Sequence, residues 1–199
     1  MRKLINLFAL LGFIFFSTNS FSYSSDPKIF IEELVGDAIK TLSDKNISKP
    51  DKEKKIKTIA LENIDINAIS MYTLGAIRKT LDQDTLEKYK ELFEKYFLKS
   101  LTSRLSDYSN NKFEVISAEQ KTETTTIVTS KIVENSSQPE IKIEWRIYTK
   151  NSLKPLIRDL RVEGLSIART QKEEFSSILN SNNNDMNILF LNSILNIKT

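Results

Sequence analysis

The sequence predicts an α+β fold, because helical patterns come first along the chain, strand patterns follow, and short helical patterns come last. From residue 27 to about residue 108 apolar side chains recur every three to four positions, whereas between residues 113 and 167 they tend to alternate every second position. There is no internal repeat and no linker-like stretch, so one domain accounts for these elements. We expect N-terminal helices and a long helix packed on a curved antiparallel sheet of about four strands, followed by C-terminal helices.

Residues 1–22 have the layout of a secretory signal peptide. A basic start at Arg2 and Lys3 is followed by an apolar run over residues 4–16 and by a region of small residues that includes Ser20 and Ser22. The alternative is an N-terminal membrane anchor, but this run is shorter than the approximately 20 residues that span a bilayer. The chain has no cysteine for lipid attachment. We therefore expect cleavage after Ser22 and a single exported domain over residues 23–199.

The composition excludes several functions. The full chain of 199 residues carries a net charge of +3, but without Arg2 and Lys3 there remain 27 basic and 26 acidic residues. This balance gives no electrostatic support for a nucleic-acid partner. Histidine and cysteine are both absent, which excludes a Ser-His-Asp triad, an imidazole base, a thiolate nucleophile and a Cys/His metal site. We expect no enzyme activity, no metal and no cofactor.

The first predicted helix begins at Pro27, is capped by Asp26 and runs to about Thr41. A second starts at Lys49-Pro50-Asp51, and a third spans residues 66–79. The fourth is the longest, starts at Asp82 or Asp84 and extends for about 25 residues, or near 37 Å. It has a wide apolar stripe that contains Leu86, Tyr89, Leu92, Phe93, Tyr96, Phe97, Leu101, Leu105 and Tyr108. The stripe is typical of a helix with one buried side.

The strand patterns begin at Phe113 and Val115. A second strand is predicted over residues 124–133, rich in Thr, Ile and Val, and a third over residues 141–148, where apolar and polar residues alternate strictly. A fourth lies within residues 155–167. Four consecutive strands predict an antiparallel meander with one dry face and one wet face. Two short helices are expected around residues 171–179 and 185–197.

No cluster of side chains predicts catalysis. The carboxylates are scattered over polar faces, and there is no glycine-rich phosphate loop. Asp159 lies between Arg158 and Arg161, and we expect it to be a structural salt-bridge partner. Three interpretations remain open: a carrier of an apolar ligand, a secreted cone-fold enzyme that uses Asp159 with Tyr72, or a solid-core module that binds other proteins.

Several segments in order resemble one family. Residues 71–78 (MYTLGAIR), which precede the long helix, the strand segment 143–146 (IEWR), and above all residues 159–166 (DLRVEGLS) are similar to segments of the MlaC (toluene-tolerance) family of auxiliary ABC-transport proteins. Phe175 occupies the aromatic position of the following helix. Two positions depart from the family. Many members have Trp or Tyr where this chain has Ile77, and many have Arg where it has Lys172.

The resemblance implies a periplasmic phospholipid carrier of a Gram-negative envelope. Such a protein moves lipid between an outer-membrane lipoprotein complex and an inner-membrane ABC transporter with an MCE-domain subunit, which maintains outer-membrane lipid asymmetry. The implied fold is a cone related to cystatin and nuclear-transport-factor folds, with a hydrophobic cavity for acyl chains. We expect a monomer whose partners are phospholipid and these two complexes.

The dry faces suggest which residues line such a cavity, although core packing is the alternative for each. Arg78 and Arg146 are candidates for contacts with the phosphate of the head group. Gly164 is expected to serve the backbone as a bulge or a tight packing point, and Asp159 and Glu163 are expected to hold structure. The candidate lining residues are Leu74, Tyr89, Phe93, Phe97, Ile143, Trp145, Leu160 and Val162.

Overall fold

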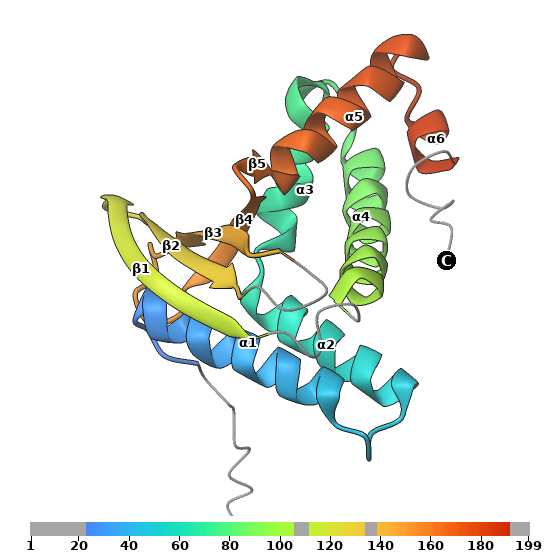
Figure 1. Cartoon of the computed structure of the whole chain (residues 1–199). Helices are drawn as coiled ribbons and strands as arrows, with labels where there is room; N and C mark the ends of the chain where they lie inside the picture. Colours follow the sequence, from blue (N-terminus) through green and yellow to red (C-terminus); the bar gives the residue numbers. More distant parts are fainter. Residues whose placement is uncertain (1–22, 106–111, 134–138, 192–199) are drawn as a thin grey trace, which may run out of the picture.

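The computed structural model describes residues 23–105, 112–133 and 139–191, and the predicted signal peptide lies outside these ranges. The elements within them (Figure 1) are α1 (Pro27–Ser43), α2 (Lys49–Asn63), α3 (Ile66–Leu74), the 3-10 helix η1 (Gly75–Lys79), α4 (Gln83–Leu105), β1 (Phe113–Thr122), β2 (Thr125–Ile132), β3 (Ile141–Tyr148), β4 (Leu156–Val162), β5 (Leu165–Ser166), α5 (Ile167–Ser181) and α6 (Met186–Leu189). None of the helices in these ranges is long and apolar enough to cross a membrane.

The strands form one antiparallel sheet in the order β1-β2-β3-β4-β5. The α+β prediction is therefore confirmed, with five strands instead of about four. The additional strand, β5, has only two residues and returns along β4 through a tight turn. A pair of residues is too short to produce an alternation pattern, which is why the sequence does not indicate it.

Capping residues explain where the helices start. Asp26 accepts hydrogen bonds from the backbone of Lys28 and Ile29, as predicted for α1. Asp82 accepts one from the backbone N–H of Thr85 at the start of α4, and this bond lowers the pKa of the Asp82 carboxyl. The third predicted helix is divided instead, because Gly75 has a φ of +67° and ends α3. The predicted stripe residue Tyr108 lies outside the described residues.

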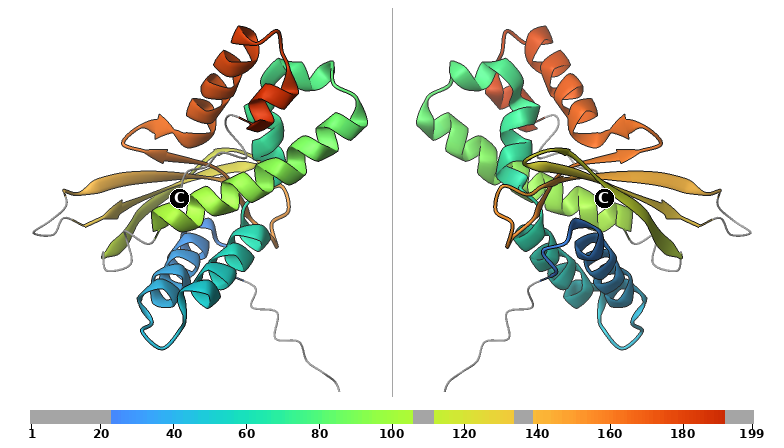
Figure 2. Two further views of the ribbon diagram at one scale, coloured as in Figure 1. Left: turned by 90° about the vertical axis from the view of Figure 1, so that its right-hand side faces the viewer. Right: turned by 90° about the vertical axis from the view of Figure 1, so that its left-hand side faces the viewer.

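The described core is divided into two clusters. The sheet cluster joins α1 to the sheet and contains Phe30, Ile31, Leu34, Val128, Ile147 and Ile157. The helical cluster joins α2 to α6 and contains Ala60, Ile66, Ile69, Leu74, Tyr89, Phe93, Leu98, Ala168, Phe175, Leu179, Met186, Leu189 and Phe190. Figure 2 shows α1 and α2 on one side of the sheet, and in its left view α4 crosses in front of the strands. Of the two longest helices, α1 packs directly on the sheet, whereas the buried side of α4 faces other helices.

A polar joint connects the two clusters where α2 passes into α3. The backbone N–H of Asp65 donates to the carbonyl of Ile157 on β4, and the Asp65 carboxylate accepts from Arg158 with both Nε and Nη2 at 2.8 Å from the same oxygen. The guanidinium of Arg158 also stacks on the ring of Tyr148, 3.3 Å from its centroid. The start of α3 is thereby tied to the sheet.

Candidate apolar ligand site

One face of the sheet carries a continuous line of side chains from one edge to the other. Direct cross-strand pairing places five residues side by side, and directly opposite residues in antiparallel strands point to the same face. We call this set the apolar row, and it consists of Val115, Ser130, Ile143, Val162 and Leu165. Next to it, Val128, Trp145 and Leu160 form a parallel line. Four predicted lining residues, Ile143, Trp145, Leu160 and Val162, therefore share this face as two opposite pairs.

The polar atoms on this face are satisfied within it. The indole N–H of Trp145 donates to Ser130 Oγ at 2.7 Å. The Ser130 hydroxyl, which is fully buried, donates to the carbonyl of Ile143 at 3.4 Å. Since both groups already have partners, neither needs one from a ligand. The face therefore presents mainly carbon atoms.

Burial of this face decreases along the sheet. Val128 and Ile147 are fully buried against α1, and Trp145 packs on the border of the sheet cluster, with its ring edge-to-face to Phe113 at 6.2 Å. Leu160 and Val162 are only half-buried. Neither Leu160 nor Val162 belongs to the sheet cluster or the helical cluster of the described residues. The face is covered by α1 at one side and becomes accessible toward β4 and β5.

The four candidate residues on helices are placed differently. Leu74, Tyr89 and Phe93 are at most 2% exposed and lie inside the helical cluster. The ring of Phe93 lies 5.8 Å from Tyr89 and 6.3 Å from Phe175, and Phe97 stacks on it at 6.2 Å. These rings pack against one another, and of the four helical candidates only Phe97 is partly accessible. The structure thus separates the helical candidates from the four on the sheet.

Burial in the helical cluster raises the pKa of the Tyr89 phenol well above its ordinary value. Tyr89 Oη lies 2.8 Å from Thr73 Oγ1, and Thr73 gives its only proton to the carbonyl of Ser70. Tyr89 is therefore the donor in its bond with Thr73. This arrangement is structural, because it satisfies a phenol that the core would otherwise leave unpaired.

The two candidate arginines do not converge on the apolar row. Arg78 donates through Nη1 to the carbonyls of Met71, at 3.3 Å, and of Gly75, where α3 ends. Arg146 follows Trp145 in β3 and is exposed on the opposite face of the sheet, since successive side chains in a strand alternate.

Asp159 has a structural role, but its partners differ from those expected. Its carboxylate accepts from Ser166 Oγ at 2.6 Å and from the backbone N–H of Ala168 at 3.1 Å, so it fixes the start of α5. The neighbouring arginines pair elsewhere, Arg158 with Asp65 and Arg161 with Glu144. The salt bridge predicted from Arg158 and Arg161 is thus wrong. Arg161 shares the face of Asp159 but pairs with Glu144, directly opposite it in β3, and Arg158, at the register shift of β4, reaches Asp65 instead.

The Glu163-Gly164 pair forms a two-residue hairpin turn with φ values of 50° and 81°. Positive φ at both central positions is the geometry that matches the twist of antiparallel strands. A side chain at Gly164 would meet nothing within 4 Å, so the glycine is needed for its backbone conformation and the predicted bulge or packing point is wrong. Leu165, directly after this turn, was not expected at the site.

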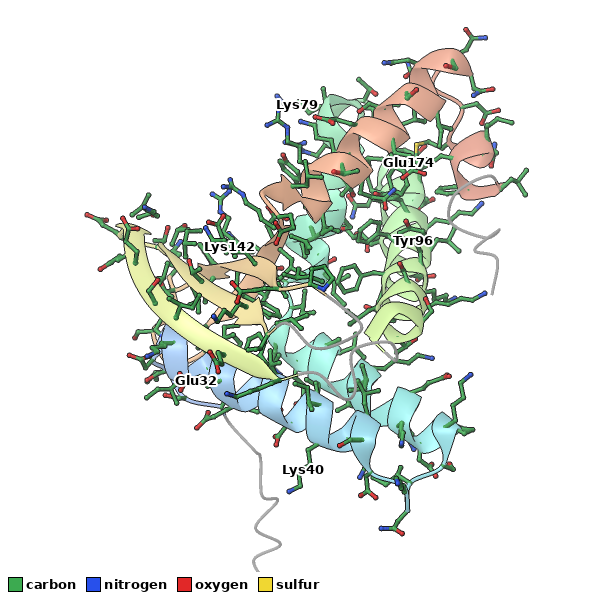
Figure 3. The ribbon with its side chains drawn as sticks, viewed as in Figure 1. Glu32, Lys40, Lys79, Tyr96, Lys142 and Glu174 are labelled. Atoms are coloured by element: carbon green, nitrogen blue, oxygen red, sulfur yellow. The ribbon has the colours of Figure 1, made fainter. Side chains whose placement is uncertain are left out.

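Two of the surface hollows formed by the described residues lie near the candidate residues. One of about 520 Å³ is polar and lies on α3 and α5, where Lys172 is 5.1 Å from the centroid of the exposed Tyr72 ring. The other, of about 590 Å³, lies between α1 and β1 and is lined by Glu32, Gly36, Ile39, Phe113, Glu114 and Val115. Figure 3 labels Glu32 on the part of α1 beside β1. Through Val115 this hollow meets the end of the apolar row, and sequence periodicity did not indicate it.

Nothing in this arrangement resembles a catalytic or metal centre. The residues that the structure describes contain no group of three or more His, Cys, Asp or Glu side chains that could hold a metal ion. Tyr72 is exposed beside Lys172, while both oxygens of Asp159 accept hydrogen bonds at the start of α5. Fold and site together define a small α+β domain with an apolar surface suited to a nonpolar ligand.

The chain belongs to the MlaC family, because the family model described as "MlaC protein" matches residues 32–193. Its fold is similar to that of a phospholipid-binding protein from Ralstonia solanacearum, solved in complex with a phospholipid. The TM-score is 0.66 at 13% sequence identity, over 81% of this chain and 90% of the other. No curated protein matches the chain. The family points to a binding or transport protein rather than to an enzyme.

Proposed function

We propose that this protein is a periplasmic phospholipid carrier that holds an acyl chain on the sheet face formed by the apolar row and its neighbours Trp145 and Leu160. The observation that carries the proposal is the continuity of this face, whose polar atoms are satisfied internally and whose burial decreases toward β5. The phospholipid in the Ralstonia solanacearum relative supports the choice of ligand.

The dimensions of the apolar row fit one acyl chain. Five strands spaced by about 4.8 Å give a row about 19 Å long. A bilayer core of about 30 Å contains two leaflets, so one acyl chain occupies roughly 15 Å. A chain that lies across the strands is therefore about as long as the row. Such a chain can contact Val162 and Leu165 directly, whereas Ser130 and Ile143 are covered by the protein and must become accessible for the whole row to be occupied.

The energetics favour transfer between membranes over release into water. Burial of each CH₂ stabilises by about 0.8 kcal/mol relative to water, or about 12 kcal/mol for roughly 15 methylenes. Relative to a bilayer the net gain is near zero, because both surroundings are apolar. We propose that exchange takes place when the protein docks as a monomer on an outer-membrane lipoprotein complex and on an inner-membrane ABC transporter with an MCE-domain subunit, which maintains lipid asymmetry. The signal peptide over residues 1–22 delivers it to the periplasm.

The proposed lining consists of the sheet candidates Ile143, Trp145, Leu160 and Val162. The helical candidates Leu74, Tyr89 and Phe93 are buried in the helical cluster. Of the four helical candidates, Phe97 is the one with surface available to a ligand. Arg78 and Arg146 are left out of the proposed head-group contacts, because Arg78 is engaged with carbonyls and Arg146 lies on the far face.

The single tryptophan, Trp145, allows a direct test. Delipidated protein is loaded from mixed micelles with phosphatidylcholine brominated on one acyl chain and then freed of micelles by gel filtration. We expect strong quenching of Trp145 fluorescence, because bromine quenches at contact distance and Trp145 borders the row. The control is the same lipid without bromine. A gel-filtered protein that retains no phospholipid would exclude the carrier function, and retention without quenching would move the ligand away from the sheet face.

A further inference from the structure

The β4–β5 hairpin exposes an apolar side chain at the end of the apolar row. Leu165 is 70% exposed, and Ile167, two residues further on, is exposed as well. A single exposed leucine is common on protein surfaces, and Leu153, 79% exposed on the turn between β3 and β4, is an example. Leu165 differs from Leu153 because it continues an apolar face.

The continuity follows from the pairing of the hairpin. Val162 and Leu165 lie directly opposite each other across the Glu163-Gly164 turn, so their side chains share one face. Along the row, Ser130 is fully buried, Ile143 is 8% exposed, Val162 is half-buried and Leu165 projects into solvent. The row therefore has no polar interruption between the interior and the surface at β5.

The position of Leu165 is fixed by its surroundings. The N–H of Glu163 donates to the carbonyl of Lys142 at 3.0 Å, and the Glu163 carboxylate accepts from the N–H of Lys142. On the other side, Ser166 is the N-cap of α5 and donates to Asp159. The hairpin thus holds an exposed leucine on a backbone that is bonded on both sides.

Charged side chains border both ends of the row. At the β1 end, Glu32 and Glu114 line the hollow, and each forms a salt bridge with a lysine. At the β5 end, Arg169 in the first turn of α5 forms a salt bridge with a glutamate. Arg161 lies on the same face of the sheet as Arg146, away from the row, so it is not a head-group candidate. Exposure of the row, rather than charge, therefore distinguishes the β5 end.

From this geometry we propose that the β4–β5 hairpin and the start of α5 form the entrance through which an acyl chain of a phospholipid reaches the apolar row. Leu165 and Ile167 make the first contacts with the chain, while the phosphate stays outside in solvent, beside the start of α5. This inference rests on the proposed phospholipid-binding function.

The test compares exposed apolar residues at three places. Delipidated wild type and the variants Leu165→Ser, Leu153→Ser and Ile116→Ser are mixed in a stopped-flow instrument with monomeric dioctanoylphosphatidylcholine, and Trp145 fluorescence gives the association rate. Ile116, 54% exposed on β1, represents the opposite edge. We expect Leu165→Ser to slow association on the order of fivefold to tenfold and the two control variants to stay within about twofold of wild type. Bound lipid at saturation, measured after gel filtration, is expected to match wild type for the controls Leu153→Ser and Ile116→Ser. Leu165→Ser removes part of the row itself, so it is judged by its association rate.

The outcomes separate the two proposals. Equal rates for Leu165→Ser and Leu153→Ser, with normal binding at saturation, would overturn the entrance and leave the carrier function intact. Slower association for Ile116→Ser alone would place the entrance at β1. A wild type that binds no lipid at saturation would overturn both proposals. Thermal melts establish that each variant is folded, and Ile167→Ser, expected to slow association in the same direction, provides an independent second variant.

Discussion

The helical cluster and the apolar row use similar side chains for different purposes. In the helical cluster, Tyr89, Phe93 and Phe175 are almost completely buried and contact one another ring to ring. In the apolar row, burial falls steadily from Ser130 to Leu165. Amino-acid type and periodicity are the same for a core and for a ligand surface. The difference is whether the chain itself supplies the neighbours of each side chain.

Both regions satisfy their buried polar atoms internally, although the consequences differ. Tyr89 donates to Thr73 within a filled core, and Trp145 donates to Ser130 beside a face that remains partly accessible. In the first case the bond permits a large ring to be buried, whereas in the second it removes polarity from a surface that an acyl chain could cover. The variants below test whether the two regions respond as differently as their burial implies.

The largest effect is expected for Phe93→Ala in the helical cluster. Phe93 contacts four aromatic rings, those of Tyr89, Tyr96, Phe97 and Phe175. Its removal leaves a cavity that these rings can fill only in part, so we expect the free energy of unfolding to fall by about 3–5 kcal/mol. Urea denaturation of the lipid-free protein measures this loss. A loss below about 1 kcal/mol would mean that the helical cluster is loosely packed and is itself a candidate for the ligand surface.

A pH-dependent effect of intermediate size is expected from Tyr89. Because burial raises its pKa, the folded protein keeps the phenol protonated at a pH where the unfolded chain, with an ordinary pKa of 10.0, ionises. The stability is fully present below pH 10 and decreases as the pH rises above it, by at most about 1.4 kcal/mol per pH unit for one group. Denaturant titrations between pH 9 and 11 measure the slope.

The control for this titration is Tyr89→Phe, which keeps the ring and removes the ionisable group. Its slope above pH 10 should be shallower than that of wild type. Tyr23 remains in both proteins, and its pKa is also raised, to about 12, by burial and by the carboxylate of Asp37, so its contribution cancels in the comparison. Parallel slopes for the two proteins would show that the phenol of Tyr89 is not desolvated in the folded state.

The fold could be predicted where a local pattern determines it. Asp26 and Pro27 mark the start of α1, and strict alternation places Ile143 and Trp145 on one face of β3. The fold class and the antiparallel direction of the strands follow from such patterns. The placement of α4 does not, because its aromatic stripe is equally suited to a sheet or to the helices that it contacts.

The site could be predicted only in part, because it depends on register. Trp145 is opposite Leu160, but Ile147 is opposite Ile157, since the pairing of β3 and β4 shifts between Arg146 and Ile147. Such a shift changes which residues of β4 face inward, and alternation alone does not locate it. Leu165 was missed for a related reason: its face is determined by a turn with positive φ at Glu163, where Asn or Asp is more usual.

The smallest effect on stability is expected for Val162→Ala in the apolar row. Val162 is half-buried and, among the described residues, is part of neither cluster. Removal of two methyl groups from such a position should cost about 1 kcal/mol or less in the lipid-free protein. The same groups would contact a bound acyl chain, so the affinity for dioctanoylphosphatidylcholine should fall by about threefold to fivefold. Urea denaturation and equilibrium titration of Trp145 fluorescence measure the two quantities on one preparation.

The ratio of the two effects distinguishes a core residue from a ligand-contacting one. Truncation of a core residue lowers the free energy of unfolding without a specific loss of binding, whereas truncation of a ligand-contacting residue mainly lowers the affinity. If Val162→Ala destabilised the lipid-free protein as much as Phe93→Ala and left the affinity unchanged, the apolar row would be an ordinary core and the distinction between the two regions would fail.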